Sequence, residues 1–328
     1  MKKRLYNIDN LRGVVTCLVV LGHVLWGFEG MYNYSGNEEI IRVTLLKYIY
    51  SFHMPIFFAL SGYFFAFDRR RKFEDVKKFV FHKFISLMIP YFLFSIIYWV
   101  TKKLLSSVLM SPVSVSELLG IVIRPIEFMW YLYALFFVNC FAEILAYIIK
   151  NKKIIWAISL LLMFMPDVGI SVIDFVKGYM FYFCLGNIIT VVNKRGHKVF
   201  LCSLFGIFNI ILFFANIDFA MKYVVVTISG VLFWMMLFLC WDEQIKIPIL
   251  YQLGKNGMPI YLMHVVAVGG IRIILNKIGI VSFVPNLIIG FIGAILLCQV
   301  IYELIIRKIK VLDFIFYPAR YLNSKEYI

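Results

Sequence analysis

Residues 8–28 of this chain read IDNLRGVVTCLVVLGHVLWGF. The stretch is long and apolar enough to cross a bilayer, which takes about 20 residues in an α-helix. It also carries Arg12 and His23, although ionisable groups inside a bilayer are costly. A secretory signal peptide is the alternative, but Asp9, Asn10 and Arg12 interrupt its start and no small-residue cleavage site follows. The stretch therefore predicts a first membrane helix whose polar residues need a partner or a function.

The composition of the whole chain agrees with a membrane protein. Of the 328 residues, 62% are apolar and 16% charged, against about 45–50% and ~25% in soluble chains. The formal charge is +15, but the basic residues form short clusters between apolar runs, which is typical of topology signals and excludes nucleic acid as a partner. The six cysteines fall one to a run without disulfide or metal spacing, so we interpret them as packing residues.

Ten apolar stretches qualify as spanning helices, although the fifth is short. They cover residues 11–28, 48–67, 84–100, 128–149, 154–165, 175–192, 199–215, 223–241, 258–275 and 283–306. The prediction is an all-α integral membrane bundle of about ten transmembrane helices. Residues 1–328 form a single transmembrane domain in this interpretation, because no loop is long enough for a separate soluble domain.

The distribution of lysine and arginine predicts the orientation. With the N-terminus inside and ten spans, 24 of the 33 basic residues fall on the cytoplasmic side, including those of the loop expected over residues 69–83. Cytoplasmic loops carry the excess of these residues, so both termini are predicted to be cytoplasmic. We expect a multi-pass protein of the cell membrane.

Arg12, Thr16 and His23 share one stripe of the first helix. Eleven residues separate Arg12 from His23, and eleven steps of about 100° return to within ~20° of the start, about 16 Å further along the axis. Two interpretations of Arg12 stay open. It either extends to the lipid headgroups or belongs to a site that also uses the deep His23.

The second helix contains Phe52-His53-Met54-Pro55, followed by Ser61 at a small-residue pair. His53 and His23 come to similar depth, so they can form an acid/base pair or relay. The alternative is that each bonds a backbone carbonyl. No third ligand lies at metal spacing on either helix, so no metal site is predicted.

Three arginines, Arg69 to Arg71, follow the second helix. They serve either as a topology anchor that touches anionic membrane lipid or as a phosphate site, since the planar guanidinium suits phosphate. Trp130 begins the fourth helix, where an aromatic belt is expected. Tyr261 and His264 share a face of the ninth, where a hydrogen-bonded core pair is the simplest interpretation.

At these residues the chain resembles acyltransferase family 3 of integral membrane O-acyltransferases, and within it the fucose 4-O-acetylase-related branch. The most specific motif is Ile8-Asp9-Asn10-Leu11-Arg12-Gly13 leading to Leu21-Gly22-His23. Further matches are Phe52-His53-Met54-Pro55, Trp130-Tyr131-Leu132 and Tyr261-Leu262-Met263-His264. The chain departs from the family at Gly257, where a hydroxyl residue is commoner, and ahead of Pro90, where it has His82 and Lys83 in place of arginines.

The resemblance implies transfer of an acyl group, usually acetyl, from cytoplasmic acetyl-CoA to a carbohydrate hydroxyl. His23 would be the general base, with His53 as a second catalytic residue; a covalent acyl-histidine is a variant. The implied ligands of the coenzyme A diphosphate are Arg12, Arg69, Arg70, Arg71 and Lys83. The implied residues for substrate or structural support are Asp9, Ser61, Trp130, Tyr261 and His264.

The acceptor is not encoded in any motif, so capsule, exopolysaccharide, O-antigen and wall glycans are all compatible with the sequence. Such an acceptor reaches the membrane itself or is delivered by glycan-biosynthesis partner proteins. A secondary transporter or flippase is the alternative function, because it too has many spans and intramembrane charges. No inverted repeat supports it, and no Asp or Glu lies deep within an apolar run, apart from residues near helix ends.

Overall fold

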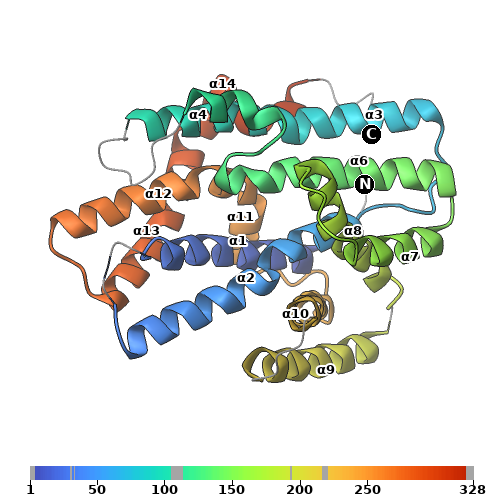
Figure 1. Cartoon of the computed structure of the whole chain (residues 1–328), viewed down its shortest axis with the longest axis horizontal. Coiled ribbons are helices and arrows are strands. Elements are labelled where there is room, and N and C mark those ends of the chain that lie inside the picture. The colour runs from blue at the N-terminus through green and yellow to red at the C-terminus, as the bar shows by residue number, and fades with distance from the viewer. Residues whose placement is uncertain are drawn as a thin grey trace. The chain divides into compact units, whose positions relative to one another are not determined.

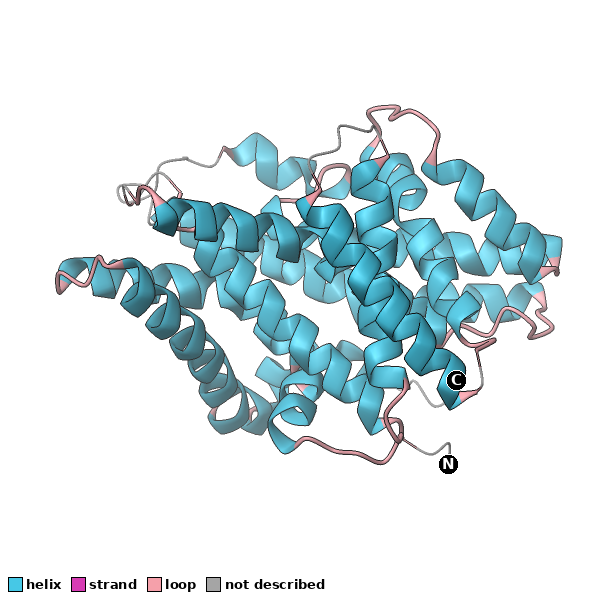
Figure 2. Ribbon diagram, turned by 90° about the horizontal axis from the view of Figure 1, so that it is seen from below, coloured by secondary structure: helices cyan, strands magenta, loops and turns pink. Residues whose placement is uncertain are grey.

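The structure, a computed structural model, describes residues 4–29, 32, 34–104, 114–192, 194–215 and 221–322. Lys2 and Lys3 of the predicted cytoplasmic set lie outside the described residues. Within these ranges the chain is helical and has no strand (Figure 2). Nine of the described helical segments are long and apolar enough to cross a membrane. The predicted class, a polytopic membrane bundle, is therefore confirmed at this level.

The chain forms two compact units. The first comprises Met1–Phe57 and Thr190–Lys308. Its elements are α1 (Tyr6–Trp26), most of α2 (Asn37–Tyr63), α9 (Arg195–Phe214), α10 (Lys222–Leu239), α11 (Pro248–Lys255), α12 (Gly257–Lys277), α13 (Phe283–Leu304) and η4 (Ile306–Lys308).

The second unit comprises Phe58–Ile189 and Ile309–Ile328. It holds the end of α2, α3 (Phe73–Lys83), the π-helical η1 (Phe84–Met88), α4 (Ile89–Leu104), α5 (Val115–Leu119), η2 (Gly120–Val122), η3 (Glu127–Met129), α6 (Trp130–Ile149), α7 (Lys152–Met163), α8 (Ser171–Ile189), α14 (Lys310–Phe316) and η5 (Pro318–Arg320). Pro90 explains the π-helical turn, because proline has no N–H for the regular hydrogen-bond ladder.

In the first unit α1 is the central helix and packs against α10, α11, α12 and α13 (Figure 1). Glycines permit the closest approach. A Cβ on Gly13 would overlap the carbonyl of Leu250, and a Cβ on Gly254 would overlap the carbonyl of Asp9. Small residues let two helix backbones meet in this way. Further along, Val20, Val24 and Leu25 of α1 form a buried apolar cluster with residues of α12 and α13.

Two predicted boundaries were wrong. The predicted second span starts at residue 48, but α2 begins at Asn37 because Glu38 and Glu39 favour a helix N-terminus and Glu39 pairs with Arg42 of the next turn. Residues 73–83, expected in a loop, form α3, whose first turn contains two acidic residues. Asp75 there accepts a hydrogen bond from the Lys72 N–H at 2.8 Å.

The glycine contact between α1 and α11 generates a stability prediction. Gly13→Ala forces a methyl group against a backbone carbonyl that cannot rotate away, and overpacking of this kind costs about 1–3 kcal/mol. Gly270→Ala in α12 is the matched control, because its Cβ would meet no atom within 4 Å. We expect a lower melting temperature in detergent for Gly13→Ala and an unchanged or higher one for the control. Equal melting temperatures would contradict the close contact.

Candidate active site

Hydrogen bonds of polar side chains hold the start of α1 in place. Asp9 is buried and accepts hydrogen bonds from Arg4 at 2.7 Å and from Arg12 at 3.4 Å. Hydrogen bonding to this carboxylate raises the pKa of Arg4. Asn10 donates to the carbonyl of Ile245 at 2.9 Å and accepts from the N–H of Ile247 at 3.2 Å. The Asp-Asn-Leu-Arg-Gly motif therefore orients Arg12 and fixes α1 to the segment that precedes α11.

The stripe of α1 faces α12. Thr16 donates to the carbonyl of Arg12 at 2.8 Å, and a Cβ on Gly257 would lie 3.2 Å from its hydroxyl oxygen. Seven residues further along both helices, the His23 ring meets the His264 ring edge to face, with 4.5 Å between the ring centroids. The two helices therefore run side by side in the same direction.

His53 of α2 joins this group through Tyr50. The Tyr50 ring lies 4.9 Å from His53 and 6.4 Å from His23, centroid to centroid. Gly22 allows the approach, because a Cβ there would come within 2.8 Å of the Tyr50 ring. Tyr261 lies 5.9 Å from His264. The first unit therefore brings together three histidines and two tyrosines, the histidine cluster.

The hydrogen bonds of the three histidines define their tautomers. Nδ1 faces a carbonyl of the preceding turn in each case, at 2.9 Å in His23, 2.8 Å in His53 and 2.6 Å in His264. A carbonyl oxygen only accepts, so Nδ1 carries the proton. In the neutral ring the lone pair is therefore on Nε2, the nitrogen that can act as a base.

Exposure separates His23 from the other two. His53 is 3% exposed and His264 is fully buried, whereas His23 is only partly buried. Arg12, at the other end of the stripe, keeps 38% of its side chain exposed. Part of the His23 residue is therefore exposed, whereas His53 and His264 are enclosed.

The second unit contains the remaining predicted binding residues. The Arg71 side chain is buried, donates to Glu143 at 2.8 Å and also donates to the carbonyls of Ala66, Phe67 and Arg69. Glu143 is a buried carboxylate within α6, so the expectation that no acidic residue lies deep in an apolar run was wrong. The arginine satisfies this charge inside the unit.

The other predicted phosphate ligands of the second unit have different surroundings. Arg69 and Arg70 are exposed, and Arg69 lies 3.6 Å from Asp75. Lys83 ends α3 and sits over the Phe79 ring, with 5.3 Å between the ammonium nitrogen and the ring centroid. Arg69 and Arg70 therefore have side chains accessible to a ligand, whereas that of Arg71 is enclosed.

The two predicted support residues of this unit have local partners. Ser61 donates to Asn139 at 3.2 Å. Trp130 stacks on Phe175 and Tyr179, with centroid distances of 5.7 and 5.3 Å. Trp130 is thus part of an aromatic stack within the second unit.

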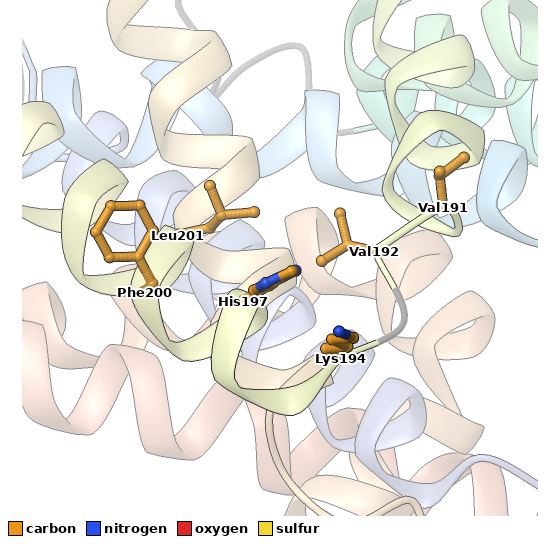
Figure 3. A pocket seen from close by; sticks show the side chains of 6 residues that line it. All are labelled: Val191, Val192, Lys194, His197, Phe200 and Leu201. Carbon is orange, nitrogen blue, oxygen red and sulfur yellow. The ribbon is translucent and has the colours of Figure 1, made fainter.

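No group of three or more His, Cys, Asp or Glu side chains in the described ranges could hold a metal ion. A separate pocket of about 480 Å³ lies at the start of α9. Figure 3 shows the residues that line it, which are Val191, Val192, Lys194, His197, Phe200 and Leu201. None of them belongs to the predicted site, and both polar members are exposed.

The residues of this site lie within a region that the chain shares with known proteins. The chain matches the family described as Acyltransferase domain over residues 5–303, which includes every residue of the histidine cluster and Arg12. The chain belongs to this acyltransferase family. The family match and the nine apolar helices of the described residues together indicate a multi-pass membrane protein with an acyltransferase domain.

Two relatives match part of this acyltransferase. Nodulation protein NolL of Mesorhizobium japonicum is 27% identical over 184 residues, which is 55% of this chain and 46% of that protein. Nodulation protein NolL of Sinorhizobium fredii is 28% identical over 183 residues, or 54% and 46%. The matches thus span about half the length of these curated relatives. No solved structure matches the chain.

Three features were missed from the sequence. His264 was assigned to a core pair with Tyr261, but its ring lies against His23. Glu143 and Arg272 were also missed, although both are ionisable residues within apolar runs. An ionisable residue in such a run indicates either a functional group or one with a charged partner. The helix neighbours that bring such residues together cannot be read from the spacing within one helix.

The buried Arg71–Glu143 pair generates a second prediction. Glu143→Gln removes the counter-charge of a buried arginine, and breaking such a pair costs about 3–5 kcal/mol. We expect a marked loss of thermal stability for Glu143→Gln and also for Arg71→Met, measured on the full chain in detergent. The double variant Arg71→Met/Glu143→Leu should recover part of this loss. Arg70→Gln, on an exposed side chain, is the control and should melt like the wild type; losses that simply add in the double variant would exclude the pairing.

Proposed function

We propose that this protein is a membrane O-acyltransferase that moves an acyl group, acetyl in the first instance, from cytoplasmic acyl-CoA to a carbohydrate hydroxyl. The observation that carries the proposal is His23, which is accessible, has its Nδ1 proton fixed by a carbonyl, and shares a helix face with Arg12. Family membership supplies the reaction class.

The geometry of α1 suits a coenzyme A thioester. Arg12 would hold the diphosphate, and the pantetheine arm would lie along the stripe past Thr16. The axial rise of about 16 Å between Arg12 and His23 is close to the length of that arm. In the second unit, Arg69, Arg70 and Lys83 are candidates for phosphate binding from the sequence alone, whereas the enclosure of Arg71 favours a structural role for its side chain.

The reaction requires one base at the thioester. Nε2 of His23 takes the proton from the acceptor hydroxyl while the oxygen attacks the thioester carbonyl. The carbon–sulfur bond breaks, the ester is formed, and the proton passes from His23 to the departing thiolate. His264 and His53 support the ring of His23 from the buried side, through direct contact and through Tyr50.

The acceptor in this proposal is a cell-surface or lipid-linked glycan, and the resemblance to the fucose 4-O-acetylase-related branch favours a sugar hydroxyl. Capsule, exopolysaccharide, O-antigen and wall glycans are candidate acceptors, and the cell membrane is the proposed location. Labelled acetyl-CoA added to membranes that contain the chain, followed by identification of the labelled product, tests this assignment.

The packing of the first unit also supports ten spans with cytoplasmic termini. Parallel neighbours such as α1 and α12 need an odd number of crossings between them. The long helical segments between them number six in the described part of the chain, so α7 is the helix available for the seventh crossing. With ten spans, the excess of basic residues on one side favours cytoplasmic termini.

The third prediction concerns the proposed base. His23→Ala should lower acetyl transfer by about 10²–10⁴-fold, the usual contribution of a positioned base, while coenzyme A still binds. Arg12→Gln should instead weaken coenzyme A binding, and Arg12→Lys should restore it only in part, because a point charge does not reproduce a bidentate contact.

The readouts are the turnover of labelled acetyl-CoA and the affinity for coenzyme A of purified protein. His197→Ala, an exposed histidine on α9, is the matched control and should keep full turnover. Turnover of His23→Ala above a tenth of the wild-type value would exclude His23 as the base.

The fourth prediction concerns α7. Cysteines introduced at Asn151 and Val168, which flank α7, should react with a membrane-impermeant maleimide from opposite sides of sealed vesicles. The parent chain corrects for labelling of the native cysteines. Reaction of both positions from the same side would remove the tenth span and would contradict the parallel packing of α1 and α12, because an even number of crossings between two helices makes them antiparallel.

A further inference from the structure

Arg272 is a charged residue within the membrane helix α12, eight residues beyond His264. Its guanidinium donates to the carbonyl of Gly27, the residue that caps the C-terminal end of α1. A Cβ on Gly27 would overlap this guanidinium, so the absence of a side chain there makes the contact possible.

The contact places Arg272 next to the proposed base. The N–H of Gly27 donates to the carbonyl of His23 at 2.9 Å, so these residues are one helical turn apart on the same face of α1. Four residues correspond to about 6 Å along the axis. The guanidinium of Arg272 therefore lies just beyond His23, on the side opposite to Arg12.

The charge of Arg272 is not balanced within the described residues. No carboxylate among them forms an ion pair with it, and its Nε is buried without a hydrogen-bond partner. Arg42 provides the contrast at the same end of α1. It donates to the carbonyl of Leu25, but Glu39 neutralises it through two hydrogen bonds of 2.7 and 2.6 Å. Capping of α1 therefore does not require an unbalanced charge.

Aromatic side chains lie next to this charge. Burial raises the pKa of the Tyr32 hydroxyl, and the nearby charge of Arg272 offsets part of this rise. Tyr32 stacks on Tyr34, with 5.3 Å between the ring centroids, and both contact Phe28. An arginine with a buried, unused donor thus stands among partly exposed aromatic rings.

We propose that Arg272 binds an anionic group, phosphate or carboxylate, of the carbohydrate acceptor and thereby positions the acceptor hydroxyl at His23. The inference rests on the proposed function and adds the class of acceptor, a negatively charged glycan. The guanidinium suits such a group because it carries a permanent positive charge and several N–H donors. A membrane phospholipid offers the same phosphate chemistry, so the experiment separates the two sources.

The test uses the purified full chain in dodecyl maltoside, which contains no phosphate. The affinities for glucose 1-phosphate, glucuronate and methyl glucoside are measured for the wild type, Arg272→Gln, Arg272→Lys and Gly27→Ala. Arg42→Gln is the matched control, because it removes the other arginine that donates to the end of α1. Coenzyme A affinity is measured in parallel on every variant.

We expect at least one of the two anionic sugars to bind the wild type about 10–100-fold more tightly than methyl glucoside, as a charge-assisted contact predicts. Arg272→Gln should abolish this preference and leave coenzyme A binding unchanged. Arg272→Lys and Gly27→Ala should retain part of it, since one keeps a charge and the other displaces the guanidinium. Arg42→Gln should melt at a lower temperature but keep the preference.

Three results would overturn the proposal. One is a wild type with no preference for either anionic sugar, and another is a preference that survives in Arg272→Gln. The third is that phosphatidylglycerol, but neither sugar, stabilises the wild type and not Arg272→Gln, which assigns the charge to lipid. A wild type that does not bind coenzyme A would instead contradict the proposed function itself.

Discussion

The close contact between α1 and the α11–α12 pair is the constraint on which the rest of the first unit depends. Gly13 and Gly254 let the backbones meet without intervening side chains, and Gly257 continues the approach beside Thr16. This contact determines the register of two parallel helices. One consequence is that His23 faces His264, and another is that the end of α1 reaches Arg272.

The two units deal with buried charge in different ways. In the second unit Glu143 and Arg71 neutralise each other, and the arginine also donates hydrogen bonds to three carbonyls. This buried charge therefore has a structural role. In the first unit the histidines satisfy Nδ1 with backbone carbonyls and keep Nε2 as a base, while Arg272 lacks a counter-charge in the described residues. Ionisable groups are costly in an apolar environment, so their presence there favours a functional role for them.

The sequence predicted much of the fold because apolar length is a property of a single segment. Each of the ten predicted stretches overlaps a helix, and the stripe of Arg12, Thr16 and His23 follows from helical periodicity alone. The early start of α2 was missed because its first turns are polar and owe their stability to Glu39 and Arg42. The contact of His23 with His264 joins residues 241 positions apart, which no local pattern encodes.

In the proposed reaction, Nε2 of His23 acts at the end of a donor that lies along the stripe of α1. A cryo-electron microscopy structure of the full chain with coenzyme A would show whether the donor lies there. We expect the diphosphate at Arg12 and the thiol sulfur within about 4 Å of Nε2 of His23, as a reactive arrangement requires. A coenzyme A whose thiol ends away from His23, with its diphosphate away from Arg12, would rule out this arrangement.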